Sequence, residues 1–270
     1  MLTELLGKPD DWKYGVLSGR QMTQDEGNME ALVTEKVGKE LPLSDVAYKK
    51  IKDAILVCAL APGSKHSEQQ LAAYLDFSRT PVHQAVVRLE QEGWLTFLPR
   101  KGVAISTVTA EEMAHVYEIL MSLESLGVVR LASRPKDIDD GVDLQLEQAR
   151  LDGEKALENH DLQGWARADD RFHTLFVDSS GNPLLSRLAA NVREKAHRAR
   201  LLTLDKRPLP LRSNQDHKEI LDAIIRREPE LARAALEAHR TRGMNTLLPI
   251  LQDLQSPRDQ LHQFFAEKTN

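Results

Sequence analysis

The apolar residues of this 270-residue chain recur mainly at the three- and four-residue spacing that is typical of amphipathic helices. In residues 45–60, Val46, Ile51 and Ile55 follow this spacing and predict a helix, which the Ala-Pro-Gly sequence at 61–63 ends. A second helix is expected to reach about residue 75, and a third follows it. The stretches "WLTFL" and "VAIS", joined by the turn-forming sequence PRKG, predict a two-stranded hairpin.

The ends of the second and third helices carry more specific signals. Ser67 and Gln70 have the spacing of a capping box, in which each side chain accepts a hydrogen bond from the other residue's backbone N–H. Asp76 stands at the turn, where a short polar side chain tolerates left-handed backbone geometry. Ser78 is predicted to cap the third helix, and Pro81 is tolerated in its first turn. Three helices, a tight turn and a hairpin predict a winged helix-turn-helix.

Beyond residue 109 the spacing of the apolar residues predicts helices only, with breaks at proline, glycine and asparagine. The predicted helices span about 110–134, 137–158, 161–178, 183–203, 213–227 and 230–253. They predict a mainly α protein in which an all-α six-helix bundle follows the winged helix-turn-helix. We divide the chain into an extension of unknown role (1–42), a DNA-binding domain (43–107), a helical effector-binding and dimerisation domain (108–255) and a tail (256–270). Short helices are expected at 28–39 and in the tail.

Composition and charge narrow the function. Apolar residues make up 41% and charged residues 29%, as in a globular protein with a packed core. The formal net charge is −5, but DNA binding requires only a basic docking face. Cys58 is the only cysteine, which excludes an intrachain disulfide and favours a reducing compartment. The N-terminus lacks the apolar region of a secretory signal, and no apolar run is long enough for a membrane span, so we expect a cytoplasmic protein.

Positive residues stand where a winged helix-turn-helix meets DNA. The third helix of such a module enters the major groove N-terminus first, so Arg79, Thr80 and His83 are expected near base edges and phosphates. Arg100 and Lys101, at the hairpin tip, are expected to reach the adjacent groove or backbone. The alternative is a helical protein-interaction domain in which these residues are merely solvated. The ordered combination of capping box, turn and basic tip favours DNA binding.

The helical half contains a candidate metal site. Asp169 and His173 are four residues apart, so they share one helix face, while His217 and His239 lie on later helices. Three imidazoles and a carboxylate that converge in a bundle would hold a divalent transition metal, most readily zinc or nickel. Asp170 is the alternative to Asp169. Single helical histidines are more often surface or hydrogen-bonded residues, as we expect for three others: His160, His197 and His262.

Residues 46–106 resemble the N-terminal domain of the GntR family of bacterial transcription regulators. The resemblance is carried by the Ala-Pro-Gly sequence, by "SEQQLAAYLDFSRTPVHQAVVRLEQEGWL" and by "PRKGVAIS". It implies DNA contacts from the start of the third helix and a glycine at the wing tip. The candidate DNA-binding residues are Gln69, Ser78, Arg79, Thr80, His83, Arg100, Lys101 and Gly102. The family usually has arginine at position 83 and near 69, and glycine at 58 and 76, so we expect an altered operator or weaker binding here.

The helical half resembles the FCD ligand-binding domain of the FadR-type branch of that family, and its six helices are similar to the VanR-like subgroup. The matching motifs are "DDRFH", "SSGNPLL" and "DHKEILDAIIRREPELARAALEAHR". In many members the corresponding residues bind a metal, which implies Asp169, His173, His217 and His239. Relatives often carry an arginine where this chain has Leu120, three residues before a Leu-Glu pair. That contact to a carboxylate effector is missing, and Arg198 or Arg200 are the candidates to replace it.

Together these features imply a homodimeric transcription regulator that binds double-stranded operator DNA. Most relatives are repressors released by a metabolite, so a small effector, expected to be an organic acid bound at the metal, would shift helices and change the spacing of the two DNA-binding domains. A metal-dependent hydrolase is one alternative, but four protein ligands depart from the three-ligand catalytic zinc pattern and no general base is assigned. We therefore expect no enzyme. A purely structural or metal-sensing site is the other alternative.

Overall fold

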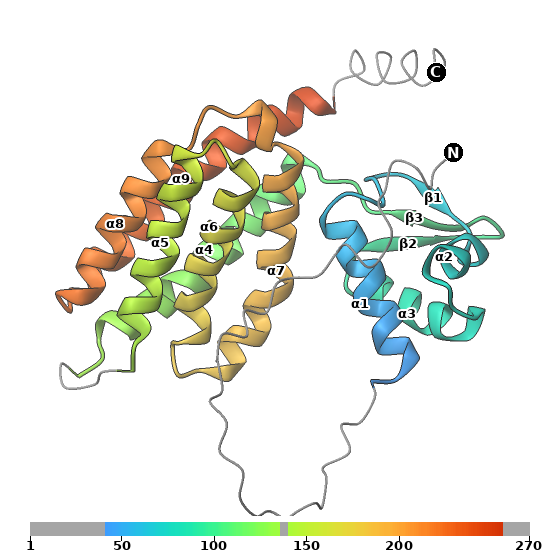
Figure 1. Ribbon diagram of the computed structural model, residues 1–270, viewed down its shortest axis with the longest axis horizontal. Helices are drawn as coiled ribbons and strands as arrows, with labels where there is room; N and C mark the ends of the chain where they lie inside the picture. The colour runs from blue at the N-terminus through green and yellow to red at the C-terminus, as the bar shows by residue number, and fades with distance from the viewer. Residues whose placement is uncertain (1–40, 136–139, 256–270) are drawn as a thin grey trace, which may run out of the picture. The chain divides into compact units, whose positions relative to one another are not determined.

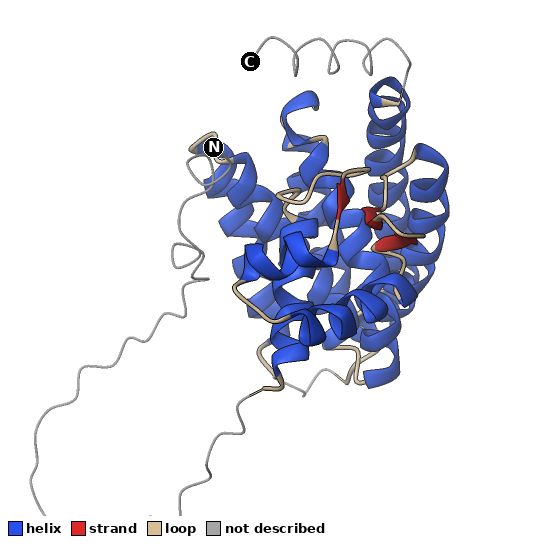
Figure 2. Ribbon diagram, turned by 90° about the vertical axis from the view of Figure 1, so that its right-hand side faces the viewer, coloured by secondary structure: helices blue, strands red, loops and turns tan. Residues whose placement is uncertain are grey.

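The computed structural model describes residues 41–135 and 140–255 (Figure 1). The helices expected at 28–39 and in the tail lie outside these residues. Helices dominate the described chain, as predicted, and the strands form one small sheet (Figure 2). In chain order the elements are α1 (Leu43–Leu56), β1 (Lys65–His66), α2 (Glu68–Leu75), α3 (Arg79–Gln91), β2 (Leu95–Leu98), β3 (Gly102–Ile105), α4 (Ala110–Ala132), α5 (Val142–Glu158), α6 (Leu162–Asp178), α7 (Pro183–Leu202), the 3-10 helix η2 (Leu204–Lys206), α8 (Leu211–Ile225) and α9 (Pro229–Leu254).

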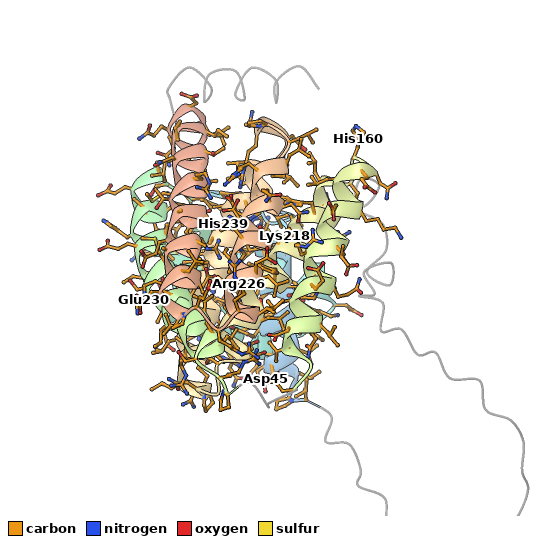
Figure 3. The ribbon with its side chains drawn as sticks, turned by 90° about the vertical axis from the view of Figure 1, so that its left-hand side faces the viewer. Asp45, His160, Lys218, Arg226, Glu230 and His239 are labelled. Carbon is orange, nitrogen blue, oxygen red and sulfur yellow. The ribbon has the colours of Figure 1, made fainter. Side chains whose placement is uncertain are left out.

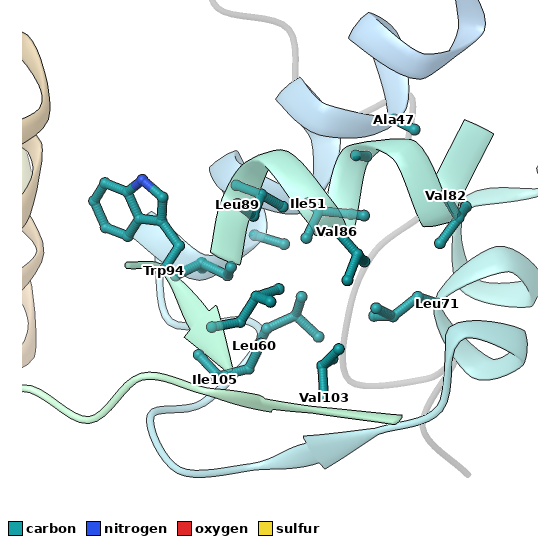
Figure 4. Close-up of a cluster of buried hydrophobic side chains, with 14 of the residues drawn as sticks. Ala47, Ile51, Leu60, Leu71, Val82, Val86, Leu89, Trp94, Val103 and Ile105 are labelled. Carbon is teal, nitrogen blue, oxygen red and sulfur yellow. The ribbon is translucent and has the colours of Figure 1, made fainter. Parts of the chain in front are cut away.

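The first three helices and the sheet share one apolar core. Ile51 of α1, Leu71 of α2 and Val86 of α3 turn toward Val103 and Ile105 of β3 in the space between helices and sheet (Figure 4). The strand order is β1-β3-β2, with both pairs antiparallel. The hairpin was predicted, but β1 was not, because two residues are too few to show an alternating pattern. These elements form the winged helix-turn-helix.

Gly102 begins β3 at the point where β1 passes closest to the hairpin. Its φ is +91°, and a Cβ at this position would collide with the carbonyl oxygen of His66. Only glycine combines this backbone geometry with such a close approach. The steric role of Gly102 is therefore sufficient to explain a glycine at the wing.

The two predicted helix caps have different outcomes. The capping box is present, since Ser67 Oγ accepts from Gln70 N at 3.1 Å and Gln70 Oε1 accepts from Ser67 N at 2.8 Å. Asp76 ends α2 in the left-handed region, with φ 57° and ψ 46°, as predicted. Ser78 precedes α3, but its side chain makes no capping hydrogen bond. Pro81 occupies the third helical position and has no N–H to offer, so the predicted cap bond is wrong.

Helices α4 to α9 run alongside one another as a bundle (Figure 1). They are the six α-helices of the described residues beyond 109. Their ends agree with the predicted ones to within two residues, except that α5 begins at Val142, whereas its predicted start at 137 lies outside the described residues. α4 approaches α6 at Gly127, where a Cβ would lie 2.5 Å from the carbonyl oxygen of Phe176. This close contact sets the position of α6 relative to α4, and α6 carries two candidate metal ligands. Within the described residues, no helix has the length and apolar content needed to cross a membrane.

Candidate metal centre and DNA-binding face

Three helices bring the four candidate metal ligands together. α6 carries Asp169 and His173, α8 carries His217, and α9 carries His239. All four are buried, and one potential ligand atom from each lies within 4.8 Å of the others. Figure 3 shows His239 among the helices, whereas His160 lies at an outer end of the bundle.

The facing atoms of the cluster are imidazole nitrogens and a carboxylate oxygen. His173 Nε2 lies 3.1 Å from His239 Nε2 and 3.9 Å from Asp169 Oδ1. His217 Nε2 lies 3.4 Å from Asp169 Oδ1 but forms no hydrogen bond among the described residues. A buried polar atom without a hydrogen bond costs free energy, and coordination to a cation removes this cost. The donor set and its unsatisfied nitrogen fit a divalent transition metal.

A carboxylate oxygen lies beside the outer ring nitrogen of two of these histidines, within hydrogen-bond distance for His239 and at ion-pair distance for His173, whose Nδ1 forms no hydrogen bond among the described residues. Glu124 Oε2 of α4 lies 3.4 Å from His173 Nδ1, and Asp216 Oδ2 of α8 lies 3.3 Å from His239 Nδ1. Such a contact orients the ring, so that the Nε2 atom faces the cluster. Arg240 in turn donates to both oxygens of Glu124, at 2.6 and 2.5 Å.

Sequence reasoning did not find these two carboxylates as site residues. Glu124 appeared only as part of a Leu-Glu pair, although a fully buried acid on an apolar helix face is a signal in its own right. Asp216 directly precedes His217 in the sequence but contacts His239 on another helix. That pairing has no signature along the chain.

Three of the four candidate ligands have the protonation state that metal binding needs. Burial lowers the pKa of His173 to about 4 and that of His239 to about 3. Burial would raise the pKa of Asp169, but Arg200 and His217 outweigh it and hold this pKa well below its ordinary value. At neutral pH the two imidazoles are therefore neutral and Asp169 is ionised.

Of the other candidate site residues in the helical half, one contacts the metal cluster and two do not. Arg200 reaches the cluster, since its Nη2 lies 2.9 Å from Asp169 Oδ2. Arg198, two residues earlier and also buried, does not. Burial lowers the pKa of Arg198, and the main influence that opposes this effect comes from Cys58. Asp170, the alternative to Asp169, lies instead 3.7 Å from His197 Nδ1, outside the cluster.

The candidate DNA-binding residues lie on the winged helix-turn-helix, and seven of the eight have exposed side chains: Gln69, Ser78, Arg79, Thr80, His83, Arg100 and Lys101. The exception, Gly102, is partly buried beside β1. Arg79 and Thr80 begin α3, and Arg100 and Lys101 stand in the β2–β3 turn. His83 is engaged elsewhere, because its Nδ1 lies 3.0 Å from Glu68 Oε1 of α2.

Two family matches cover most of the described chain. Residues 43–105 match "Bacterial regulatory proteins, gntR family", and residues 115–242 match the FCD domain. A regulator described as lying in an unstable DNA locus of Streptomyces ambofaciens is 30% identical over 81% of this chain and 88% of its own length. An Agrobacterium vitis regulator in the TAR-I ttuE-ttuC' intergenic region is 37% identical over 48% of this chain and 77% of its own length.

Solved structures agree with this at the level of the fold. Escherichia coli McbR/YncC has a TM-score of 0.66 at 19% identity, covering 77% of this chain and 98% of its own. A GntR regulator from Rhodococcus sp. RHA1 also has a TM-score of 0.66, at 21% identity, covering 76% of this chain and 97% of its own. These families and relatives are transcription regulators rather than enzymes. The chain belongs to the GntR family of bacterial transcription regulators, with a gntR-type helix-turn-helix domain followed by an FCD domain.

Proposed function

We propose that this regulator is a homodimeric repressor that leaves its operator when a small carboxylic acid binds at a metal held in the FCD domain. The observation that carries the proposal is the buried cluster of Asp169, His173, His217 and His239, whose potential ligand atoms lie within 4.8 Å. A relative from Escherichia coli that is 23% identical is described as the transcriptional repressor RspR, which supports the sign of regulation. The protein would act in the cytoplasm, where its operator lies.

Zinc or nickel suits three imidazole nitrogens and one carboxylate oxygen, and such an ion would offer its remaining positions to a carboxylate group of the effector. This chain's residues do the rest. Glu124 and Asp216 orient two of the rings, and Arg200 keeps Asp169 ionised. Because the four ligands come from α6, α8 and α9, a change at the cluster acts on three helices at once.

DNA recognition is assigned to the start of α3 and the hairpin tip. Arg79 and Thr80 are exposed there, and the Ser78 hydroxyl is left without a capping bond that would occupy it. Hydroxyl and guanidinium groups at a helix N-terminus suit phosphates and base edges. His83, held by Glu68, contributes less than the arginine usual at this position. An effector releases DNA to the extent that it binds the released conformation more tightly.

Thermal denaturation of metal-loaded and chelated protein with a panel of small carboxylic acids tests the effector site. A ligand that binds only the folded state raises the melting temperature by mass action. We expect this rise with metal but not after chelation, and its loss in His217→Gln. His160→Gln is the matched control, because His160 is exposed and outside the cluster. Acids that stabilise the chelated protein equally well would rule out a metal-held effector.

Replacing Arg79 with alanine tests the recognition helix. Since a good guanidinium–base contact contributes about 1–3 kcal/mol, we expect operator affinity to fall by about fivefold to somewhat over a hundredfold. Fluorescence anisotropy on DNA from upstream of the protein's own gene measures the affinity. The control Arg226→Ala removes an exposed arginine at the end of α8 and should bind DNA as wild type does. Wild-type operator binding by Arg79→Ala would place recognition elsewhere.

A further inference from the structure

Arg207, which follows η2, has a buried donor with nothing to bind. Its Nε donates to Thr203 Oγ1 at 3.0 Å. Its Nη2 is buried and forms no hydrogen bond among the described residues. A guanidinium donor removed from water without an acceptor is costly, so this group is suited to an anion that the protein itself does not supply.

Arg207 interacts electrostatically with Arg200 and Asp169, which are part of the metal cluster and its immediate surroundings. Thr203, its hydrogen-bond partner, follows Arg200 by three residues and therefore shares a face of the same helical segment. Arg200 contacts Asp169 at 2.9 Å. Consistent with this placement, burial lowers the pKa of Arg207, and Tyr117, Arg200 and Asp169 are the ionisable groups that modify the effect.

Tyr117 of α4 brings a hydroxyl to the same region. The side chain is 3% exposed, and it interacts electrostatically with both Arg207 and Arg240. Tyr117 precedes Leu120 by one helical turn, and Leu120 precedes Glu124, the partner of His173, by another. Its ring also lies beside Gly243, one turn beyond His239, where a Cβ would be 3.9 Å away. The phenol therefore lies one helical turn from Leu120 on α4 and about one turn from the level of His239 on α9.

The charges around the cluster do not cancel. Arg200 is paired with Asp169 and Arg240 with Glu124, so these two arginines are neutralised. Arg207 is the third arginine that interacts electrostatically with Asp169. Among the described residues, Arg207 forms no ion pair with an acid. A bound divalent cation would add further positive charge. The region thus has an excess of positive charge that a ligand with one carboxylate only partly offsets.

We infer that Arg207 and Tyr117 bind the second anionic group of an effector whose first carboxylate lies at the histidine cluster, so that the effector is a small diacid. This inference rests on the function proposed above and makes it more specific. Arg207 and Tyr117 then act in place of the arginine that Leu120 replaces. A fork of guanidinium donors binds a planar carboxylate in two-point fashion, and the phenol adds one hydrogen bond.

Isothermal titration of the metal-loaded full chain with carbon-matched acids, butyrate against succinate and pentanoate against glutarate, tests this inference. Wild type should bind at least one diacid tighter than its matched monoacid by about tenfold or more, the factor expected for one charge-assisted hydrogen bond. Arg207→Gln should abolish this preference while the affinities for the monoacid and the metal stay unchanged. Tyr117→Phe should reduce it by roughly three- to tenfold, as expected for one neutral hydrogen bond.

Two further variants complete the test. Lys206→Gln removes the adjacent exposed charge and should keep the full preference. Arg207→Lys keeps the positive charge but lacks the paired guanidinium donors, so it should recover part of the diacid preference. This variant takes the place of Arg207→Gln if Arg207→Gln does not fold. A full diacid preference in the Arg207 variants, or none in wild type, overturns the inference but leaves metal-dependent effector control intact. Wild type that binds metal but no acid, or no metal, overturns the proposed effector function and this inference with it.

Discussion

His173 and His239 lose their ordinary basicity because they are buried, and this links the stability of the protein to pH. Their pKa values fall to about 4 and about 3, from 6.5 for an exposed histidine. Below about pH 6.5 the unfolded chain takes up protons at these positions, while the folded chain does not until its own lower pKa values are reached. The free energy of unfolding of the metal-free protein must therefore fall between pH 6.5 and pH 4.

Urea denaturation of the chelated protein at pH 7 and pH 5 measures this effect. We expect wild type to be less stable at pH 5, with a smaller loss in His239→Gln, since one proton-uptake site is removed. His160→Gln should show the wild-type loss because that side chain is exposed. An identical pH dependence in wild type and His239→Gln would contradict the assignment.

Single residues also show which contacts can be predicted from the sequence and which cannot. Asp169 and His173 could be paired from their spacing, because a helix places residues four apart on one face. The convergence of His217 and His239 on them came from the family resemblance. The contact of Glu124 with His173 joins helices 49 positions apart in the sequence and could not be foreseen. Ser78 failed as a cap for a local reason, because the proline three residues later removes the donor.

At the scale of elements, the sequence predicts helices well and short strands poorly. Proline and glycine punctuate the bundle, so helix ends could be placed within a few residues. β1 escaped prediction because its two residues become a strand only by pairing with Ala104 and Val103. The close approach of α4 and α6 is likewise a tertiary property, visible in the sequence only as an unexplained glycine.

That close approach leads to a prediction for Gly127→Ala. The new methyl group would lie 2.5 Å from Phe176 O, so α6 must move away from α4 and displace His173, one turn before Phe176. We expect a loss of about 1–3 kcal/mol in the free energy of unfolding and weaker zinc binding. Gly243→Ala is the control, since its nearest heavy atom would be 3.9 Å away and alanine favours a helix. Wild-type zinc affinity in Gly127→Ala would show that this contact does not position the cluster.

At the scale of the whole molecule, an acidic protein reads DNA through a small basic face. The net charge is −5, so we expect the DNA contacts to concentrate where exposed basic residues stand, at the start of α3 and at the wing. For a homodimer, each of two such faces must meet the same side of the duplex. The spacing of the half-sites in the operator is then as important as their sequence.

Inserting about five base pairs between the half-sites, half a helical turn, should therefore abolish tight binding, whereas about ten should restore much of it. Electrophoretic mobility shifts with purified protein measure both, and a single half-site serves as the reference. Affinity that is independent of the inserted length would mean that the chain binds DNA as a monomer.

The position of Asp169 and His173 on one uninterrupted helix also constrains how such a protein can evolve. One residue gained or lost between them would turn one side chain about 100° around the helix axis relative to the other and remove it from the cluster. Connections such as the one between α4 and α5 carry no such constraint, because both flanking helices can keep their places. Among descendants of this gene, insertions and deletions should therefore accumulate in the connections, while the interval from 169 to 173 tolerates substitutions only.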